Sequence, residues 1–82
     1  MMIALDDVYV RLTEVFRDVF EDDDLVAKPD MTAEDVEGWT SLAHVRLMLT
    51  VEETFSVRFS AAQVASMAKV GDLAELIQKK LA

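Results

Sequence analysis

The amino-acid sequence predicts an all-α domain of three main helices and one short helix, with a long loop between the first two. Apolar residues recur at helical spacing in three separate segments. Two glycines and one proline leave few points at which a helix is interrupted. The 82 residues are 52% hydrophobic, which is too apolar for a disordered chain. This length fits one small domain, residues 1–82, with a modest core.

The first predicted helix covers residues 5–20 and ends at the acidic run of residues 21–24. Asp6 and Asp7 lie in its first turn, where acidic side chains complement the helix dipole. Apolar residues at helical spacing define its inward face, which consists of Val8, Leu12, Val15, Phe16 and Val19.

Residues 21–40 are predicted to form a long connection, a kind of segment that often carries function. Within it, residues 32–35 (TAED) resemble a helix-capping signal, and Gly38 is suited to end a turn. Val36 and Trp39 are expected to pin this loop to the core. Contact with a partner protein is the alternative role for the Trp39 ring.

The second predicted helix covers residues 41–55. At about 100° per residue, nine of its side chains fall on an arc of roughly 220°. Because this arc is wider than the apolar stripe of a surface helix, we expect the helix to be central and contacted by several others. The arc contains Leu42, His44, Val45, Leu47, Met48, Leu49, Val51, Glu52 and Phe55.

A short third helix is predicted to begin after Ser60 and to run to about Met67, following an extended linker at residues 57–59. Ser60 and Gln63 have the spacing of a capping box. Four small residues are expected to let this helix approach its neighbours closely: Ala61, Ala62, Ala65 and Ala68.

Residues 69–72 are predicted to interrupt the helical structure after the third helix, and a last helix is predicted over residues 72–81. Lys79 and Lys80 lie near its carboxyl end, where basic side chains complement the dipole. Its inward residues are expected to be Leu73, Leu76, Ile77 and Leu81.

The net charge of −8 is unevenly distributed along the chain. Residues 1–40 contain 12 acidic and 3 basic residues, whereas residues 41–82 contain 4 acidic and 5 basic ones. No basic cluster is present, so nucleic acids and anionic membranes are not expected as partners. The absence of cysteine excludes disulfides, thiolate zinc sites and cysteine nucleophiles.

No segment of the sequence has the length and apolar character of a signal or membrane-spanning segment. The apolar run at residues 1–5 is too short for a signal peptide and lacks basic residues before it. We therefore expect a monomeric, cytoplasmic protein that does not insert into membranes.

The junction between the long loop and the second helix is the candidate functional site. Thr40 and Ser41 fall at the amino-terminus of the most apolar helix, where unpaired N–H groups suit a phosphate. A plain structural role is the alternative, because threonine and serine are both common N-cap residues.

Residues 39–45 (WTSLAHV) and 51–55 (VEETF) resemble the second helix of acyl carrier proteins. In that family an Asp-Ser-Leu motif opens this helix and a hydrophobic-Glu-Glu-x-Phe pattern closes it. Residues 70–77 (VGDLAELI) are similar to the family's last helix. The resemblance covers nearly the whole chain, and its motifs occur in the right order and spacing.

The resemblance implies a bundle of the acyl-carrier type and a defined chemistry. Ser41 matches the serine that receives a 4′-phosphopantetheine group from coenzyme A. The thiol of that group carries acyl or aminoacyl cargo as thioesters, and the carrier itself is not an enzyme. The implied partners are a phosphopantetheinyl transferase, a ligase that loads the cargo, and downstream transferases.

The sequence departs from the family in three places. Thr40 replaces the aspartate before the serine, so it can cap the helix but offers no carboxylate. Ala43 and Arg46 stand where carriers of fatty-acid synthases are often acidic, and Trp39 precedes the motif. With these departures the sequence resembles that of a stand-alone carrier, which serves a specialised pathway or carries amino acids such as D-alanine. Six residues are expected to contact partners: Trp39, Thr40, Leu42, Ala43, Arg46 and Val57.

Two other functions are compatible with the sequence. One is an unmodified helical interaction module that keeps the carrier fold. The other is a small hydrolase in which His44 activates Ser41, although a packed or loop-bonded imidazole is the simpler interpretation of His44.

Three other features have structural interpretations. The acidic run at residues 21–24 lacks the spacing of an EF-hand, so we interpret it as a solvated turn and expect no metal site. Glu52 and Glu53 diverge too far on a helix to form a catalytic pair, which favours structural or docking roles. Met48 and Met67 are candidates to line a cavity for a chain, or else to pack in the core.

Overall fold

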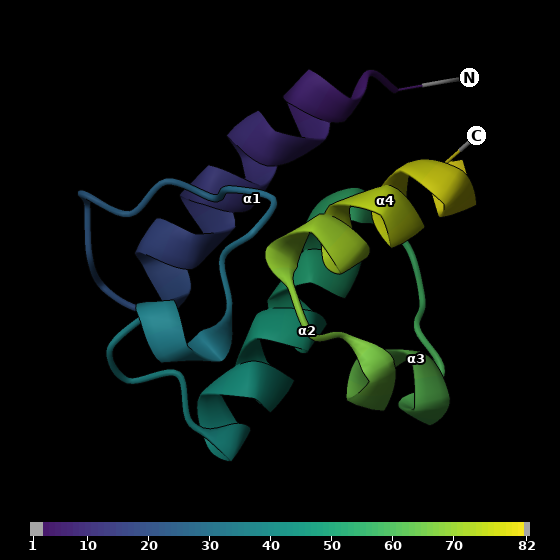
Figure 1. Cartoon of the computed structure of the whole chain (residues 1–82). Coiled ribbons are helices and arrows are strands. Elements are labelled where there is room, and N and C mark those ends of the chain that lie inside the picture. The colour runs from purple at the N-terminus through teal and green to yellow at the C-terminus, as the bar shows by residue number, and fades with distance from the viewer. Residues whose placement is uncertain (1–2, 82) are drawn as a thin grey trace.

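The computed structural model describes residues 3–81, so Met1 and Met2 of the apolar run at residues 1–5 lie outside it. It contains the helices α1 (Leu5–Val19), α2 (Ser41–Phe55), α3 (Ala61–Ser66) and α4 (Val70–Leu81), and the 3₁₀ turn η1 (Ala33–Asp35). No strand occurs among the described residues, which confirms the predicted all-α class. In Figure 1, α1, α2 and α4 form the bundle, and the long loop lies beside α1.

The apolar face predicted for the first helix is buried. All five expected residues of α1 are at most 9% exposed, and they join inward residues of α2 and α4 in one core cluster. Phe16, Leu12 and Leu47 are among the largest fully buried side chains. At about 25 cal/mol per Å² of apolar surface removed from water, this burial is the main stabilising term of the fold.

The helix that contacts two long neighbours is α1, which packs against both α2 and α4. The prediction that α2 is central and contacted by several others was wrong for one of its sides, although α2 also contacts the loop and α3 through His44. One side of α2 is buried, but three residues of its predicted inward arc face solvent: Leu42 (72% exposed), Val45 (51%) and Leu49 (55%). An apolar arc on a helix marks surface that avoids water, and it does not distinguish the core from a binding face.

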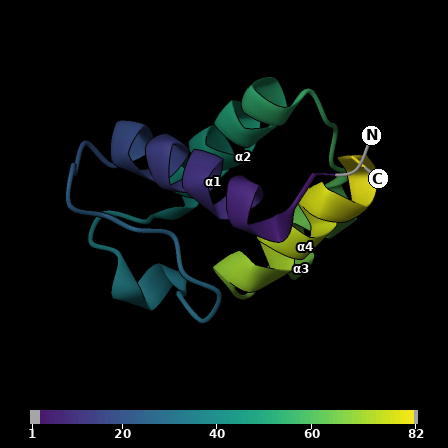
Figure 2. The same cartoon turned by 90° about the horizontal axis from the view of Figure 1, so that it is seen from above.

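The long loop is fixed to the bundle along its length. Near its start, the N–H of Ala27 donates to Thr13 Oγ1 on α1 at 3.0 Å. η1 begins with the capping box predicted at residues 32–35, in which Thr32 and Asp35 satisfy each other's backbone N–H groups. Val36 is buried, as expected, and Gly38 forms the next turn with a φ of +86°. Figure 2 shows the loop and η1 on one side of α1.

The last helix begins two residues earlier than predicted, at Val70 rather than residue 72. The reason is that loop carbonyls satisfy its first donors. The N–H of Val70 donates to Met31 O at 2.9 Å, and that of Gly71 donates to Pro29 O at 2.8 Å. Asp72 Oδ2 accepts hydrogen bonds from the N–H groups of Ala68 and Lys69. A local break signal in the sequence was overridden by these tertiary hydrogen bonds.

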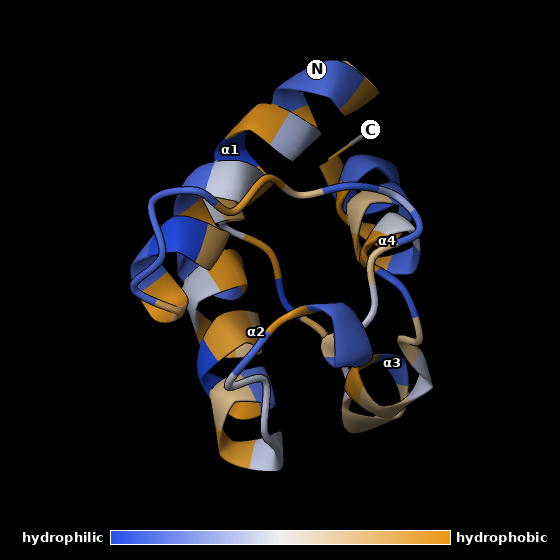
Figure 3. Ribbon diagram, turned by 60° about the vertical axis from the view of Figure 1, so that its left-hand side comes forward, coloured by the Kyte–Doolittle hydropathy of each residue, from blue (hydrophilic) through white to orange (hydrophobic). Residues whose placement is uncertain are grey.

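The short helix α3 has the predicted capping box between Ser60 and Gln63, with both hydrogen bonds formed. The expectation that its alanines allow close packing was wrong, because all four are exposed and the helix ends before Ala68. Val64 and Met67 supply the side chains of this segment that pack against the core. Figure 3 shows more orange, hydrophobic ribbon in α2 and α3 than in the loop beside α1.

Gly71 generates a first testable prediction. A Cβ at this position would lie 2.8 Å from the carbonyl oxygen of Pro29, which is backbone and cannot easily move. We expect Gly71→Ala to lower the free energy of unfolding by about 1–3 kcal/mol, as for other overpacked sites. Urea unfolding measures the loss, and hydrogen exchange at the Val70 amide reports the detached loop.

Gly38→Ala is the control for Gly71→Ala. Nothing lies within 4 Å of a Cβ at Gly38, so only its positive φ is strained, at a cost of about 1 kcal/mol. Exchange at the Val70 amide should then stay slow. A Gly71→Ala variant with unchanged stability and a protected Val70 amide would contradict the packing described here.

Candidate functional site

Thr40 caps α2 and leaves two backbone donors free beside it. The first four N–H groups of a helix lack partners within the helix. That of Thr40 donates to Gly38 O at 2.9 Å, and that of Ala43 donates to Thr40 Oγ1 at 3.2 Å. Among the described residues, the N–H groups of Ser41 and Leu42 have no acceptor. The start of α2 therefore offers two adjacent donors to an anion.

Ser41 is the first residue of α2, and its side chain is exposed. Sequence alone left open whether Thr40 or Ser41 caps the helix. The structure assigns the cap to Thr40, whose extended backbone has φ −88° and ψ 176°. Within residues 3–81, the Ser41 hydroxyl takes part in no side-chain hydrogen bond. It is therefore accessible, and its modification would leave the cap intact.

His44 connects the loop, α2 and α3 through its two ring nitrogens. Its Nδ1 lies 3.1 Å from Nε1 of Trp39, and its Nε2 lies 3.3 Å from the carbonyl oxygen of Val64. The indole N–H only donates, so Nδ1 must accept and Nε2 carries the proton of the neutral ring. Nε2 thus donates to Val64 O, a carbonyl in the last turn of α3 that has no partner within that helix.

The Trp39 ring is anchored by aromatic contacts as well. Its centroid lies 5.5 Å from that of Phe16 in an edge-to-face arrangement and 5.6 Å from that of Phe20. The Trp39 and His44 rings lie edge to edge, with centroids 6.1 Å apart and an interplanar angle of 20°, as their hydrogen bond requires. The two contacts with Phe16 and Phe20 add about 0.5–1.5 kcal/mol each beyond the area that they bury. Of the two roles considered for Trp39, the structure confirms the loop anchor.

The geometry argues against the hydrolase alternative, because His44 is not placed to act as a base for Ser41. Both nitrogens of His44 are engaged, one with Trp39 and one with Val64, and neither is hydrogen-bonded to Ser41. A general base must lie within hydrogen-bonding reach of the hydroxyl that it activates. His44 is the loop-bonded imidazole that the sequence favoured.

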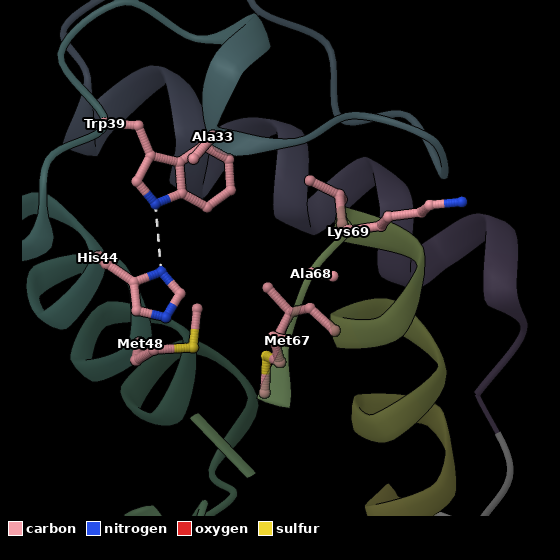
Figure 4. A pocket seen from close by; sticks show the side chains of 9 residues that line it. Ala33, Trp39, His44, Met48, Met67, Ala68 and Lys69 are labelled. Atoms are coloured by element: carbon pink, nitrogen blue, oxygen red, sulfur yellow. Dashed lines mark hydrogen bonds between the residues drawn. The ribbon is translucent and has the colours of Figure 1, made fainter. Parts of the chain in front are cut away.

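A small cavity, here called the inner pocket, lies between the loop, α2 and the start of α4. Its volume is about 50 Å³. Figure 4 shows Trp39 and His44 on one side of it and Met67, Ala68 and Lys69 on the other, with Met48 close to His44. Both methionines that were candidates for a cavity lining are therefore in its wall, together with Ala33, Val70 and Leu73.

The outer face of α2 combines apolar and charged side chains. Leu42, Val45 and Leu49 are exposed and recur at the i, i+3, i+7 spacing of a single helical stripe. Arg46 is exposed beside them. A groove continues this stripe toward α3, lined in part by Phe59, Ala61, Val64 and Ala65. We call Leu42, Val45, Arg46 and Leu49 the α2 stripe.

Comparison with solved structures identifies the family. The chain is similar to a holo acyl carrier protein from Geobacter metallireducens, whose structure was determined by NMR, with a TM-score of 0.82 and 38% sequence identity. The alignment covers 94% of this chain and 84% of the other. The chain belongs to the acyl carrier protein family. No family model matches the sequence, and no curated protein matches it either.

Of the six residues of this acyl carrier protein that were expected to contact partners, not all are exposed. Val57 is 8% exposed and belongs to the core, so its side chain offers a partner almost no surface, contrary to expectation. Ala43 and Trp39 are half-buried, whereas Thr40, Leu42 and Arg46 are exposed.

Sequence reasoning missed Val45 and Leu49 as candidate contact residues. Both were assigned to the core because their spacing matched the inward arc. The signal that distinguishes them is their position opposite the most buried residues of α2, such as Leu47 and Val51. Glu52 has a structural role, since its Oε2 accepts the N–H of Phe59 at 2.8 Å.

Metal-binding clusters and membrane-spanning helices are both absent from the described residues. Within residues 3–81, no group of three or more His, Cys, Asp or Glu side chains is arranged to hold a metal ion. No helix in this part of the chain is long and apolar enough to cross a membrane. The acidic side chains at residues 21–24 are all exposed.

Proposed function

We propose that this chain is a carrier protein in which Ser41 bears a 4′-phosphopantetheine group derived from coenzyme A. The observation that carries the proposal is the exposed hydroxyl of Ser41 at the first position of α2, next to a cap made by Thr40. The solved neighbour is a holo acyl carrier protein, which supports the same chemistry here.

The start of α2 fits a phosphodiester. The N–H groups of Ser41 and Leu42 are available to phosphate oxygens, and the positive end of the helix dipole lies at the same place. The first turn of α2 contains no acidic side chain that would repel a phosphate. Thr40 holds the first turn in helical geometry whether or not Ser41 is modified.

The group supplies a thiol on a flexible arm, to which cargo is joined as a thioester. The chain itself contributes attachment and presentation, and we propose no catalytic role for it. Tethering raises the effective concentration of cargo near a docked enzyme. Its partners would be a phosphopantetheinyl transferase, a loading ligase and downstream transferases, acting on a cytoplasmic monomer of one domain. The cargo would be an acyl group of a specialised pathway or an aminoacyl group, for example D-alanyl.

We place the partner-binding surface on the α2 stripe, with Thr40 and Ala43 at its border. Exposed apolar side chains at i, i+3 and i+7 match the way a helix docks into a groove. Arg46 gives this surface a positive charge within an otherwise acidic protein, so partners that read acidic carriers with basic patches would match it poorly.

An unmodified interaction module is the second candidate function. Thr40 favours it, because a neutral hydroxyl stands where the family has a carboxylate. The exposed α2 stripe would serve such a module equally well.

Modification of Ser41 is the test that separates the two candidates. Incubation with coenzyme A and a broad-specificity phosphopantetheinyl transferase should add one phosphopantetheine unit, detected by mass spectrometry of the intact protein. The reason is that the hydroxyl is exposed and beside two free N–H donors. Ser41→Ala should abolish the gain.

The control is Ser66→Ala, which removes another exposed serine hydroxyl, at the end of α3. This variant should be modified as the native chain is. If several transferases add no phosphopantetheine to a folded protein, the carrier proposal is wrong and the interaction module becomes the better account.

Val45 and Val10 form a matched pair for testing the α2 stripe. Both are exposed valines, but Val10 lies on α1 and is 60% exposed. With the transferase as probe, Val45→Ser should raise KM about fivefold with little change in kcat, as expected for the loss of about 1 kcal/mol of apolar contact. Val10→Ser should leave both constants unchanged. Equal effects of the two substitutions would contradict the location of this surface.

Charge reversal at Arg46 tests the electrostatic part of the same surface. Because Arg46 is exposed, Arg46→Glu should change transfer kinetics, and their dependence on salt, more than it changes stability. Steady-state kinetics at low and high ionic strength, with urea unfolding alongside, measure both. Unchanged kinetics in this variant would remove Arg46 from the proposed surface.

A further inference from the structure

We propose that His44 is a positioning residue whose neutral ring holds α3 against the long loop, and that protonation of the ring releases α3. Because α3 borders the groove beside the α2 stripe, its release changes the surface that a partner would contact. The movement of α3 requires no modification of Ser41. This inference therefore goes beyond the proposed function, and it can be tested on the unmodified chain.

α3 is attached to the rest of the fold at few points. None of its six residues is buried, and the long helices pack through contacts of α1 with α2 and α4. Among the described residues, Nε2 of His44 and the carbonyl oxygen of Val64 form the one hydrogen bond between α3 and another element. Apart from the half-buried Val64 side chain, the position of α3 therefore depends on this bond.

The neutral ring of His44 satisfies both of its partners, whereas a protonated ring does not. Nδ1 accepts the indole N–H of Trp39 at 3.1 Å, as the dashed line in Figure 4 marks, and Nε2 donates to Val64 O. A doubly protonated imidazole has a donor at each nitrogen and no acceptor. Two N–H groups would then point at each other between His44 and Trp39, so the proton replaces an attraction with a repulsion.

The His44 ring moves more easily than the Trp39 ring. The indole is packed against Phe16, which is fully buried, and against Phe20. His44 is half-buried, so its ring can turn toward solvent. Because the imidazole is rigid, a turn that takes Nδ1 away from the indole also takes Nε2 away from Val64 O. Protonation at one nitrogen therefore breaks the bond made by the other.

No nearby negative charge would keep a protonated His44 ring in place. The residues one turn away on α2 are uncharged, and so is every residue of α3. α1 reaches the site through phenylalanines that contact Trp39. Of the described residues that line the inner pocket with His44, Lys69 alone is charged, and its positive charge opposes that of an imidazolium. The other residues facing His44 across this pocket are Ala33, Trp39, Met67, Ala68, Val70 and Leu73.

Release of α3 would alter the groove that continues the α2 stripe. This groove is lined from α2 by Val45 and Leu49 and from α3 by Ala61, Val64 and Ala65. Histidine is the side chain that commonly changes charge between about pH 5 and 8. A partner that docks on both helices would therefore bind the chain with neutral His44 better than the chain with protonated His44. This consequence rests on the proposed function.

The test follows the unmodified chain by NMR as the pH is lowered from about 8. The ¹⁵N shifts of the single histidine show when its ring is doubly protonated. At that point the residual dipolar couplings of α3 should no longer fit the structure, whereas those of α1, α2 and α4 should still fit. Protection of the Trp39 indole N–H from exchange should fall about fivefold, as for the loss of one hydrogen bond. The Val70 amide, which donates to Met31 O, should keep its protection.

Two variants separate the proton on His44 from other effects of acid. The side chain of His44→Gln offers an acceptor and a donor but does not titrate, so its α3 couplings should be the same at both pH values. In Trp39→Phe no N–H opposes a proton on Nδ1. The protonated ring can then keep its bond to Val64 O, and α3 should stay in place. This second variant also serves if His44→Gln does not fold.

A kinetic measurement tests the effect on docking. With a phosphopantetheinyl transferase as probe, the KM of the native chain is divided by that of His44→Gln at each pH, which cancels the titration of the transferase itself. We expect this ratio to rise about fivefold as the ring becomes protonated, with little change in the corresponding ratio of kcat. An unchanged ratio despite the release of α3 would refute the effect on docking.

The outcomes distinguish this inference from the proposed function. Couplings of α3 that still fit the structure when the His44 ring is doubly protonated overturn the inference, and so does an equal pH response in His44→Gln. Loss of protection at the Val70 amide at the same pH also overturns it, because the chain would then unfold as a whole. Failure to modify Ser41 refutes the proposed function but leaves these measurements on the unmodified chain, and the role of His44, intact.

Discussion

The hydrogen bonds of the His44 imidazole hold together the loop, α2 and α3 around the start of α2, and the arrangement of the candidate site depends on them. The ring accepts a hydrogen bond from the Trp39 indole, which is itself packed against Phe16 of α1, and it approaches the last turn of α3. One side chain of α2 thus connects the long loop, the first helix and the short helix. Each partner has a single suitable role, since the indole only donates and the Val64 carbonyl only accepts. This leaves one ring tautomer that satisfies both.

The chemistry at the start of α2 follows from this arrangement. Because both nitrogens of His44 are engaged elsewhere, neither is placed to activate the exposed hydroxyl of Ser41. Thr40 takes the capping role, which leaves the neighbouring N–H groups open to a phosphate. In the proposed function, Thr40 would stabilise the start of the helix while Ser41 bears the prosthetic group. Family membership is consistent with these two roles.

Much of the fold could be predicted because local signals coincide with the helix ends. The capping boxes at Thr32 and Ser60 and the cap at Thr40 act over three residues, and the structure has all three. The start of α4 could not be predicted, since its first donors bind carbonyls of a loop about 40 residues away in sequence. The exposure of Val45 and the burial of Val57 could not be predicted either, because both depend on which other parts of the fold cover the side chain. Apolarity indicates that a side chain avoids water, but not whether its own core or a partner covers it.

The tautomer of His44 is the most direct test of this account. The chain has a single histidine, so a long-range ¹H–¹⁵N NMR correlation spectrum of the neutral ring is unambiguous. We expect a protonated Nε2 and an unprotonated Nδ1, with scalar coupling across the hydrogen bond from the Trp39 indole. A protonated Nδ1, or a ring that averages between the two tautomers, would contradict it. In that case the loop, α2 and α3 would not be joined as described.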